Sequence, residues 1–276
     1  EEVLKLAKGY QGDDGTWVDA DPKWDQARTI AKIYSFQRAY GAGLQTIADS
    51  TGLSLEEVTA LAEAEDKRYP EINQYFDNLE KEILRNAEPT NTFIAHPVNP
   101  AVRVQLRVSM VRTPDNKLYT FRSHPSPDWQ LKRGITSTFS PTERMNYPVQ
   151  GVGAQVMKAA MWLTVREFYR TKNFSGMALL INTVHDALYR DSHPQWSYQS
   201  SVTMHACMEL ASDFIQYWFN WPVPLPVPGD SVRGASMAQE TPLRGDKWVA
   251  DVQHEKDAIR ARYMPGFKPT YQDLED

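Results

Sequence analysis

The chain has 276 residues, of which 41% are hydrophobic and 24% charged, an ordinary globular composition with room for two modest domains. Its formal net charge of −5 at pH 7 gives no indication of nucleic-acid binding, so any such surface must be a local patch. The single cysteine, Cys207, excludes an internal disulfide and a cysteine metal cluster, and the most apolar run, Met177–Ile181, is too short to cross a bilayer. We therefore expect a cytoplasmic protein without a membrane partner.

The first half of the chain has the spacing of helices. Amphipathic patterns and helix-start signals predict three helical regions, at residues 24–49, 54–68 and 71–87. Gly41 and Gly43 interrupt the first of them. Ser54 and Glu57 fit a capping box, in which each residue satisfies a backbone N–H of the other at the start of a helix.

Strands enter the pattern in the middle of the chain. Residues 100–122 alternate with a period of two around a turn, which predicts a β-hairpin. Two later apolar runs flank a tight turn at His185-Asp186 and predict a second strand–turn–strand. Further helices are expected from Ser140 and over residues 149–169 and 199–218, while the charged tail after Trp248 is expected to be peripheral. Helices first, then mixed strands and helices, indicate an α+β fold.

Four residues spaced by four in the first helix carry the main functional signal. Arg28, Lys32, Phe36 and Tyr40 form one stripe about 18 Å long on an α-helix, with cations at one end and aromatic rings at the other. These are the dimensions and polarity of a nucleoside triphosphate, because cations suit phosphates and aromatic faces suit bases. Gly41 follows and allows a close approach. The same spacing also occurs in an ordinary amphipathic helix with a solvated basic end.

The whole stretch, Arg-Thr-Ile-Ala-Lys-Ile-Tyr-Ser-Phe-Gln-Arg-Ala-Tyr-Gly, resembles motif B, the fingers helix of family A (DNA polymerase I-like) DNA polymerases. The resemblance implies that Arg28 and Lys32 bind the triphosphate of an incoming dNTP, with Lys32 also protonating the leaving pyrophosphate. It implies that Phe36 packs on the incoming sugar. Tyr40, followed by Gly41, guards the position of the template base.

Two further motifs follow in the order of the family. Asn146-Tyr-Pro-Val-Gln150-Gly resembles the palm segment that contacts primer–template in the minor groove, where amides can pair with acceptors common to all base pairs. Thr-Val-His185-Asp186 resembles motif C, which implies that Asp186 is a metal ligand and that His185 lies near the primer terminus. Arg144 is a looser match to a primer–template contact. Taken alone, the last two motifs are also compatible with a capped helix and a simple turn.

The resemblance implies a division into fingers, residues 1–145, including the hairpin at 100–122, and the C-terminal part of a palm, residues 146–276, with a small antiparallel sheet. It also implies a reaction. A primer 3′-oxygen attacks the α-phosphate of a dNTP, and two Mg²⁺ ions clamp the attacking and leaving oxygens. A phage-type enzyme, acting in the host cytoplasm, is the expected kind.

Two departures from the family pattern concern the metal site. The family usually has an acidic residue after the motif C aspartate, where this chain has Ala187. The pattern Asp-x-Ser-x-x-Glu-x-Arg, motif A, which supplies the other metal-binding aspartate, is not found in this chain. We therefore expect the chain alone to be inactive, and a second polypeptide or a missing N-terminal segment to supply motif A and the thumb.

Two other functions remain open from the sequence. A single-subunit RNA polymerase of the phage type shares the Arg, Lys and Tyr-Gly spacing, although Phe36 and the Pro-Val-Gln-Gly segment favour DNA synthesis. A non-catalytic subunit that binds DNA and nucleotides would also fit a chain with one catalytic carboxylate.

Overall fold

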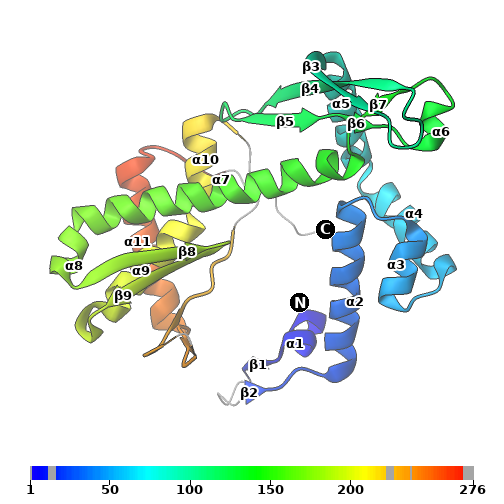
Figure 1. Cartoon of the computed structure of the whole chain (residues 1–276). Coiled ribbons are helices and arrows are strands. Elements are labelled where there is room, and N and C mark those ends of the chain that lie inside the picture. The colour runs from blue at the N-terminus through cyan, green and yellow to red at the C-terminus, as the bar shows by residue number, and fades with distance from the viewer. Residues whose placement is uncertain (1, 12–16, 222–226, 237, 270–276) are drawn as a thin grey trace. The chain divides into compact units, whose positions relative to one another are not determined.

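The computed structural model describes residues 2–11, 17–221, 227–236 and 238–269, and the chain divides into two compact units. Unit 1 comprises residues 1–112 and 118–148, and unit 2 comprises residues 113–117 and 149–276. Helices predominate and the sheets are small and antiparallel, so the expected α+β class is confirmed (Figure 1). The boundary expected between residues 145 and 146 falls inside helix α7, close to the observed division.

Unit 1 contains most of the helices and the largest sheet. Its elements are α1 (Glu2–Lys8), β1 (Tyr10–Gln11), β2 (Trp17–Val18), α2 (Pro22–Ala39), α3 (Leu44–Thr51), α4 (Leu55–Arg68), α5 (Pro70–Arg85), β3 (Glu88–Ala95), β4 (Arg103–Arg112), β5 (Leu118–Arg122), β6 (His124–Pro125), α6 (Asp128–Leu131), β7 (Ser137–Thr138) and the start of α7 (Pro141–Arg170). The expected hairpin is confirmed as β4 and β5, and β3 adds a third strand in the order β3-β4-β5.

Local signals fix the ends of the unit 1 helices. Asp21 caps α2 by accepting a 2.8 Å hydrogen bond from the backbone N–H of Lys23, and Pro22 occupies the first helical position. The helix stops before Gly41, whose φ of 75° is left-handed. The capping box between Ser54 and Glu57 is present at the start of α4, as predicted.

Two small apolar clusters support unit 1. The first packs α5 against the sheet and contains Leu79, Ile83, Val111, Tyr119 and Phe121. The second lies where α2, α3 and α4 meet and contains Tyr34, Ile47, Ala48 and Val58. In this second cluster α2 contributes only Tyr34, so little of α2 is buried.

Unit 2 combines a hairpin with packed helices. Its elements are the rest of α7, α8 (Lys172–Gly176), β8 (Ala178–Val184), β9 (Ala187–Ser192), α9 (Pro194–Glu209), α10 (Ala211–Phe219), β10 (Val232–Arg233), β11 (Thr241–Pro242) and α11 (Asp246–Tyr263). Helix α9 contacts both β8 and β9, and it packs extensively against α11 (Figure 1). The helix expected over residues 199–218 is instead two helices that meet at Leu210.

The expectation that the tail after Trp248 is peripheral is wrong. Residues 246–263 form α11, whose Trp248, Val252 and Ile259 are buried in the main core of unit 2. Three of the charged residues that suggested a solvated tail, Lys256, Arg260 and Arg262, make long-range ion pairs instead. Arg260, for example, lies 2.8 Å from the fully buried carboxylate of Asp213 on α10.

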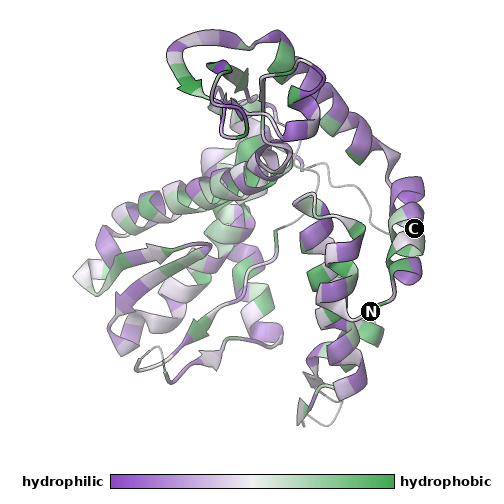
Figure 2. Ribbon diagram, turned by 45° about the vertical axis from the view of Figure 1, so that its right-hand side comes forward, coloured by the Kyte–Doolittle hydropathy of each residue, from purple (hydrophilic) through white to green (hydrophobic). Residues whose placement is uncertain are grey.

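Helix α7 is longer than the sequence indicates. The start at Ser140 and the helix from Val149 join into one helix that contains Pro148 in its interior. Hydrophilic residues alternate with hydrophobic ones along the long helices (Figure 2). Among the described residues, no helix combines the length and the apolar character needed to cross a membrane.

Candidate nucleotide-binding and metal site

The four residues with spacing of four lie on α2, as the sequence predicts. We call Arg28, Lys32, Phe36 and Tyr40 the α2 stripe. Lys32 is exposed, Arg28 and Tyr40 are half-buried, and the Phe36 side chain is 56% exposed. The rings of Phe36 and Tyr40 stack with centroids 6.4 Å apart and an interplanar angle of 19°. The aromatic end of the stripe therefore already presents a planar, stacked surface.

The cationic end of the α2 stripe is free to bind an anion. In the part of the chain that the structure describes, neither Arg28 nor Lys32 forms an ion pair with a carboxylate. Arg38, on the opposite face of the same helix, is by contrast ion-paired with two acidic residues of α4. The contrast shows that α2 uses Arg38 for its own attachment and leaves the two cations of the stripe available.

The C-terminal end of α2 meets the start of α7 within unit 1. Gly41 has a φ of 75°, and a Cβ placed on it would lie 2.7 Å from Sδ of Met145. The left-handed backbone conformation favours glycine here, and a larger residue would also have to displace the flexible side chain of Met145. The end of the α2 stripe is thereby seated against the turn of α7 that carries Arg144 and Asn146.

The predicted primer–template residues of α7 differ in their surroundings. Arg144 is largely buried, with a side chain 19% exposed, and it is ion-paired with Glu80 of α5. Asn146 is half-buried, and its side-chain oxygen has no hydrogen-bond partner among the described residues. Gln150 is exposed. Arg144 therefore has a structural partner already, but its buried Nε, like the side-chain oxygen of Asn146, has no hydrogen-bond partner among the described residues.

His185 and Asp186 form the turn of the β8–β9 hairpin, as predicted. Val184 pairs with Ala187, so the two residues between them make the whole loop. His185 has a left-handed φ of 53°, which costs a residue with a side chain about 1–2 kcal/mol. Asp186 is exposed, and its carboxylate makes no hydrogen bond or ion pair within the described residues.

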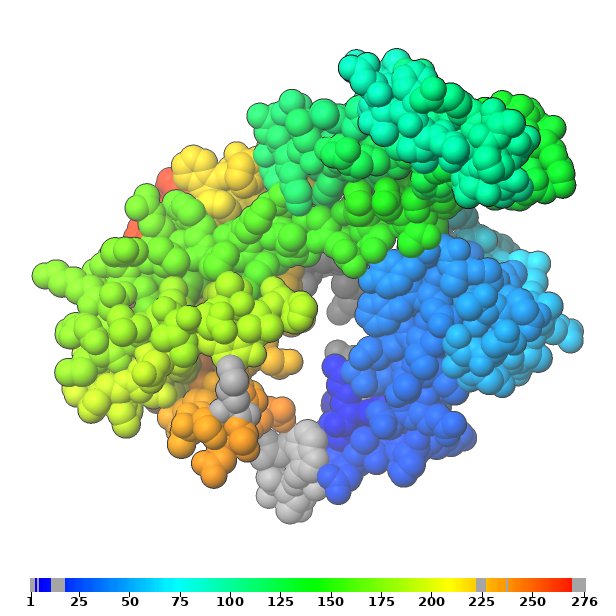
Figure 3. Space-filling view, viewed as in Figure 1, coloured from blue at the N-terminus to red at the C-terminus, as the bar shows by residue number. Residues whose placement is uncertain are grey.

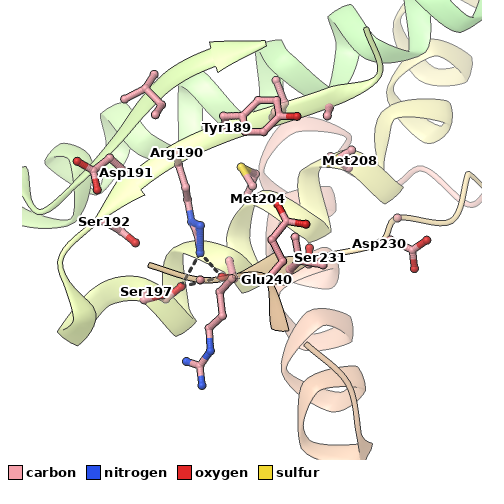
Figure 4. A pocket seen from close by; sticks show the side chains of 18 of the residues that line it. Tyr189, Arg190, Asp191, Ser192, Ser197, Met204, Met208, Asp230, Ser231 and Glu240 are labelled. Carbon is pink, nitrogen blue, oxygen red and sulfur yellow. Dashed lines mark hydrogen bonds between the residues drawn. The ribbon is translucent and has the colours of Figure 1, made fainter. Parts of the chain in front are cut away.

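A pocket of about 720 Å³ lies beside this hairpin within unit 2. Asp186 is among its lining residues, and β9, α9 and the segment 228–236 with Glu240 form its walls (Figure 4). The hairpin and this segment are neighbouring parts of the surface of unit 2 in the space-filling view (Figure 3). Arg190 lies on the wall and donates to Ser200 Oγ at 3.0 Å and to the backbone oxygen of Ser197 at 2.8 Å, and burial lowers the pKa of its guanidinium.

The residues of this chain only partly fit a magnesium site. An exposed, unpaired carboxylate such as that of Asp186 is a suitable ligand for Mg²⁺. However, no group of three or more His, Cys, Asp or Glu side chains that could hold a metal occurs among the described residues. Ala187 lies where a second acid could have followed Asp186. The described residues therefore supply one ligand and do not complete a site by themselves.

The expected site residues are divided between the two units. Unit 1 carries the α2 stripe with Gly41, and also Arg144 and Asn146. Unit 2 carries Gln150, His185 and Asp186. Sequence analysis missed Tyr34 and Glu65, which attach α2 to α4, because their contact joins residues 31 positions apart. It also missed the pocket around Arg190, whose walls come from segments far apart in the chain.

Comparison with known proteins identifies the family. The chain belongs to DNA polymerase family A, whose model matches residues 17–231. It is 39% identical over 64 residues to the DNA polymerase of Mycobacterium phage D29, and 33% identical over 63 residues to DNA polymerase I of Helicobacter pylori. Each match covers 23% of this chain but only 10% and 7%, respectively, of those proteins. The predicted resemblance is thereby confirmed.

Among solved structures, the chain is similar to the POL domain of Pol1 from M. smegmatis in complex with DNA primer-template and dNTP. That match has a TM-score of 0.45 and 16% sequence identity, and it covers 81% of this chain and 31% of the other. The chain thus spans about a third of the length of that structure.

Proposed function

We propose that this chain is the fingers and the C-terminal part of the palm of a DNA-directed DNA polymerase. Family membership supports this assignment, and the observation that carries it is the state of the α2 stripe. Two unpaired cations and two stacked, partly exposed rings follow one another along a single helix. In this proposal Arg28 and Lys32 bind the triphosphate of a dNTP. Phe36 then lies against the sugar.

The other site residues contact DNA in this proposal. Tyr40 and Gly41 bound the position of the template base. Asn146, Gln150 and His185 contact the primer–template duplex. Arg144 contacts it only if its guanidinium can bind DNA while it is also ion-paired with Glu80. The amides suit this role because they can donate to the minor-groove acceptors that all base pairs present.

Asp186 contributes one ligand of a magnesium site whose other ligands lie outside the described residues. Mg²⁺ in such a site neutralises the charge that develops on the phosphates during transfer. The remaining carboxylate would come from a further segment of the same polypeptide or from a second polypeptide. A non-catalytic subunit that binds DNA and nucleotides is the alternative, and the single carboxylate is the observation that favours it.

Two experiments test the proposal. The first is photo-crosslinking of a dNTP analogue to the chain, followed by mass spectrometry of the labelled peptides. We expect labelling within α2, reduced by Lys32→Ala but not by Lys67→Ala, which removes the same charge from the exposed face of α4. Labelling that is spread over the surface, or that is equal in both variants, would contradict the nucleotide site.

The second experiment is primer extension with Mg²⁺. We expect no extension by residues 1–276 alone, and extension after addition of a polypeptide that carries the motif A aspartate and a thumb. Asp186→Asn should abolish the restored extension. Binding of primer–template with no extension in any combination would support the non-catalytic alternative. Robust extension by the chain alone would show that its metal site is complete.

A further inference from the structure

A polar cluster attaches α2 to α4 on the side of α2 away from the stripe. The hydroxyl of Tyr34 and Nε of Arg38 both donate to the same carboxylate oxygen of Glu65, at 3.0 Å and 3.2 Å. We call these three residues the α2 clamp. Arg38 also donates to Asp66 at 2.7 Å, and Asp66 accepts at 3.1 Å from Asn73 of α5. The clamp is thereby connected to two neighbouring helices.

Helix α2 packs against α1 and α3, but this packing does little to fix its rotation about its own axis. Of its 18 residues, Tyr34 is the buried one, and the cluster it joins is small. Apolar contacts are in any case non-directional, whereas hydrogen bonds require both a distance and an angle. The bonds of the α2 clamp are therefore the contacts most able to hold α2 at one rotational setting.

The clamp and the stripe lie on opposite faces of the helix. Each residue advances about 100° around an α-helix, so the centre of the stripe lies about 160° from the centre of Tyr34 and Arg38. We infer that the α2 clamp is a positioning device that sets the rotation of α2 and so aligns the stripe with the bound dNTP. This inference rests on the proposed function.

The alignment is sensitive to small rotations. Side-chain tips lie about 5–6 Å from the axis of an α-helix, so a rotation of about 10° displaces them by about 1 Å. A displacement of about 1 Å in a reacting geometry can reduce rate about 100-fold. The stripe residues form no ion pair with any residue that the structure describes, so no such contact resists the rotation. Loss of the α2 clamp should therefore weaken the binding of dNTP more than the binding of primer–template DNA.

Two variants separate the clamp from the general stability of α2. Tyr34→Phe removes the hydroxyl and keeps the buried ring, and Glu65→Ala removes the shared acceptor. Tyr69→Phe and Glu63→Ala are the matched controls, because both residues are exposed and neither is a member of the α2 clamp. The measurements use the complete polymerase, meaning this chain with the segment that completes its metal site, and record KM for dNTP, kcat and the Kd for primer–template. The Kd for dNTP is measured in parallel on the chain itself.

We expect Tyr34→Phe to raise the KM and Kd for dNTP about threefold, and Glu65→Ala about tenfold, from the loss of one and two hydrogen bonds. The Kd for primer–template should stay within about twofold of the parent. A purely structural role would instead reduce the active fraction, which lowers apparent kcat and leaves KM unchanged. In the double variant the KM should equal that of Glu65→Ala, because Tyr34 acts through Glu65.

Lys32→Ala distinguishes a failure of this inference from a failure of the proposed function. If Lys32→Ala leaves dNTP binding unchanged, the α2 stripe is not the nucleotide-binding site, and both the proposed function of the stripe and this inference fail. If Lys32→Ala weakens dNTP binding while the clamp variants match their controls, the inference is overturned and the proposed function stands. Additive effects in the double variant would likewise overturn it.

Discussion

Gly41 is the position where the conformation of α2 can be tested without any ligand. Its φ of 75° is left-handed, and an added Cβ would lie 2.7 Å from Sδ of Met145. Gly41→Ala should therefore destabilise the chain for two separable reasons. The first is the backbone conformation, and the second is the contact with α7.

The magnitude follows from these two terms. The left-handed conformation costs alanine about 1–2 kcal/mol, and crowding in a packed contact costs about 1–3 kcal/mol. Met145 is flexible, so the crowding should fall at the low end. The unfolded chain loses entropy when glycine becomes alanine, which returns about 0.4–1 kcal/mol. We expect a net loss of about 2 kcal/mol in the free energy of unfolding.

Urea unfolding followed by far-UV circular dichroism measures this change. Gly43→Ala is the control, because Gly43 has a φ of −67° and nothing within 4 Å of its added Cβ. Its effect should stay within about 0.5 kcal/mol, since the loss of a good helix cap and the gain in unfolded-state entropy nearly cancel. In a Met145→Ala background the cost of Gly41→Ala should fall to the conformational term alone. Equal costs for Gly41→Ala and Gly43→Ala would refute the reasoning, and equal costs with and without Met145 would refute the contact.

Three further predictions concern single side chains. In the complete polymerase, Phe36→Tyr should raise dideoxynucleotide incorporation about ten- to a hundredfold in competition with dNTP. The reason is that the tyrosine hydroxyl can fill the polar position that the missing 3′-OH leaves. Unchanged selectivity would show that Phe36 does not contact the sugar. His185→Gly should stabilise the chain by about 0.5–1 kcal/mol in urea unfolding, because it relieves a left-handed φ, while it weakens primer extension. Burial alone would raise the pKa of Glu209, but hydrogen bonds from His205 and Lys256 outweigh it and lower the pKa from 4.5 to about 2. Glu209→Gln should therefore lower the free energy of unfolding at neutral pH, and lower it progressively less as pH falls from 4.5 towards 2. If the free energies of unfolding of the parent and the variant differ by the same amount at every pH, this reasoning is contradicted.

The parts of the fold that sequence analysis predicted correctly depend on neighbours along the chain. The capping box of Ser54 and Glu57 involves two residues three positions apart. The turn at His185 and Asp186 lies between two apolar runs that pair directly with each other. The continuity of α2 follows from an amphipathic spacing that ends at a glycine. In each case the interaction that determines the structure is visible within a short window of sequence.

Helix α11 shows why the rest could not be predicted. Trp248, Val252 and Ile259 have the spacing of one helical face, but charged residues separate them and hide the pattern. Lys256, which lies between Val252 and Ile259, and Arg260, which follows Ile259, pair with acids on α9 and α10 that lie 47 positions earlier in the chain. A charge with a partner so distant in sequence is read as a solvated charge. The expectation of a peripheral tail failed for that reason.

The candidate site was predictable as a set of residues but not as a structure. Motif spacing located the α2 stripe and Asp186, because chemistry requires particular side chains at particular intervals. It could not show that Arg38 belongs to the attachment of α2, since its partners lie 27 and 28 residues away on α4. It could not show that Arg144 is ion-paired with Glu80 either. Which cations are free is a property of the folded chain.

The candidate site residues can be ranked by whether their contacts within the folded chain already account for their positions. Arg144 is mostly buried, and its ion pair with Glu80 accounts for part of its place in the fold, although its Nε has no hydrogen-bond partner among the described residues. Phe36 differs, because its side chain is more than half exposed and its ring stacks on Tyr40 of the same stripe. His185 holds an unfavourable φ beside an unpaired Asp186. Residues that break the rules of stability without compensation are the ones expected at functional sites. We therefore rank the α2 stripe and the hairpin turn above Arg144 as candidates for the proposed site.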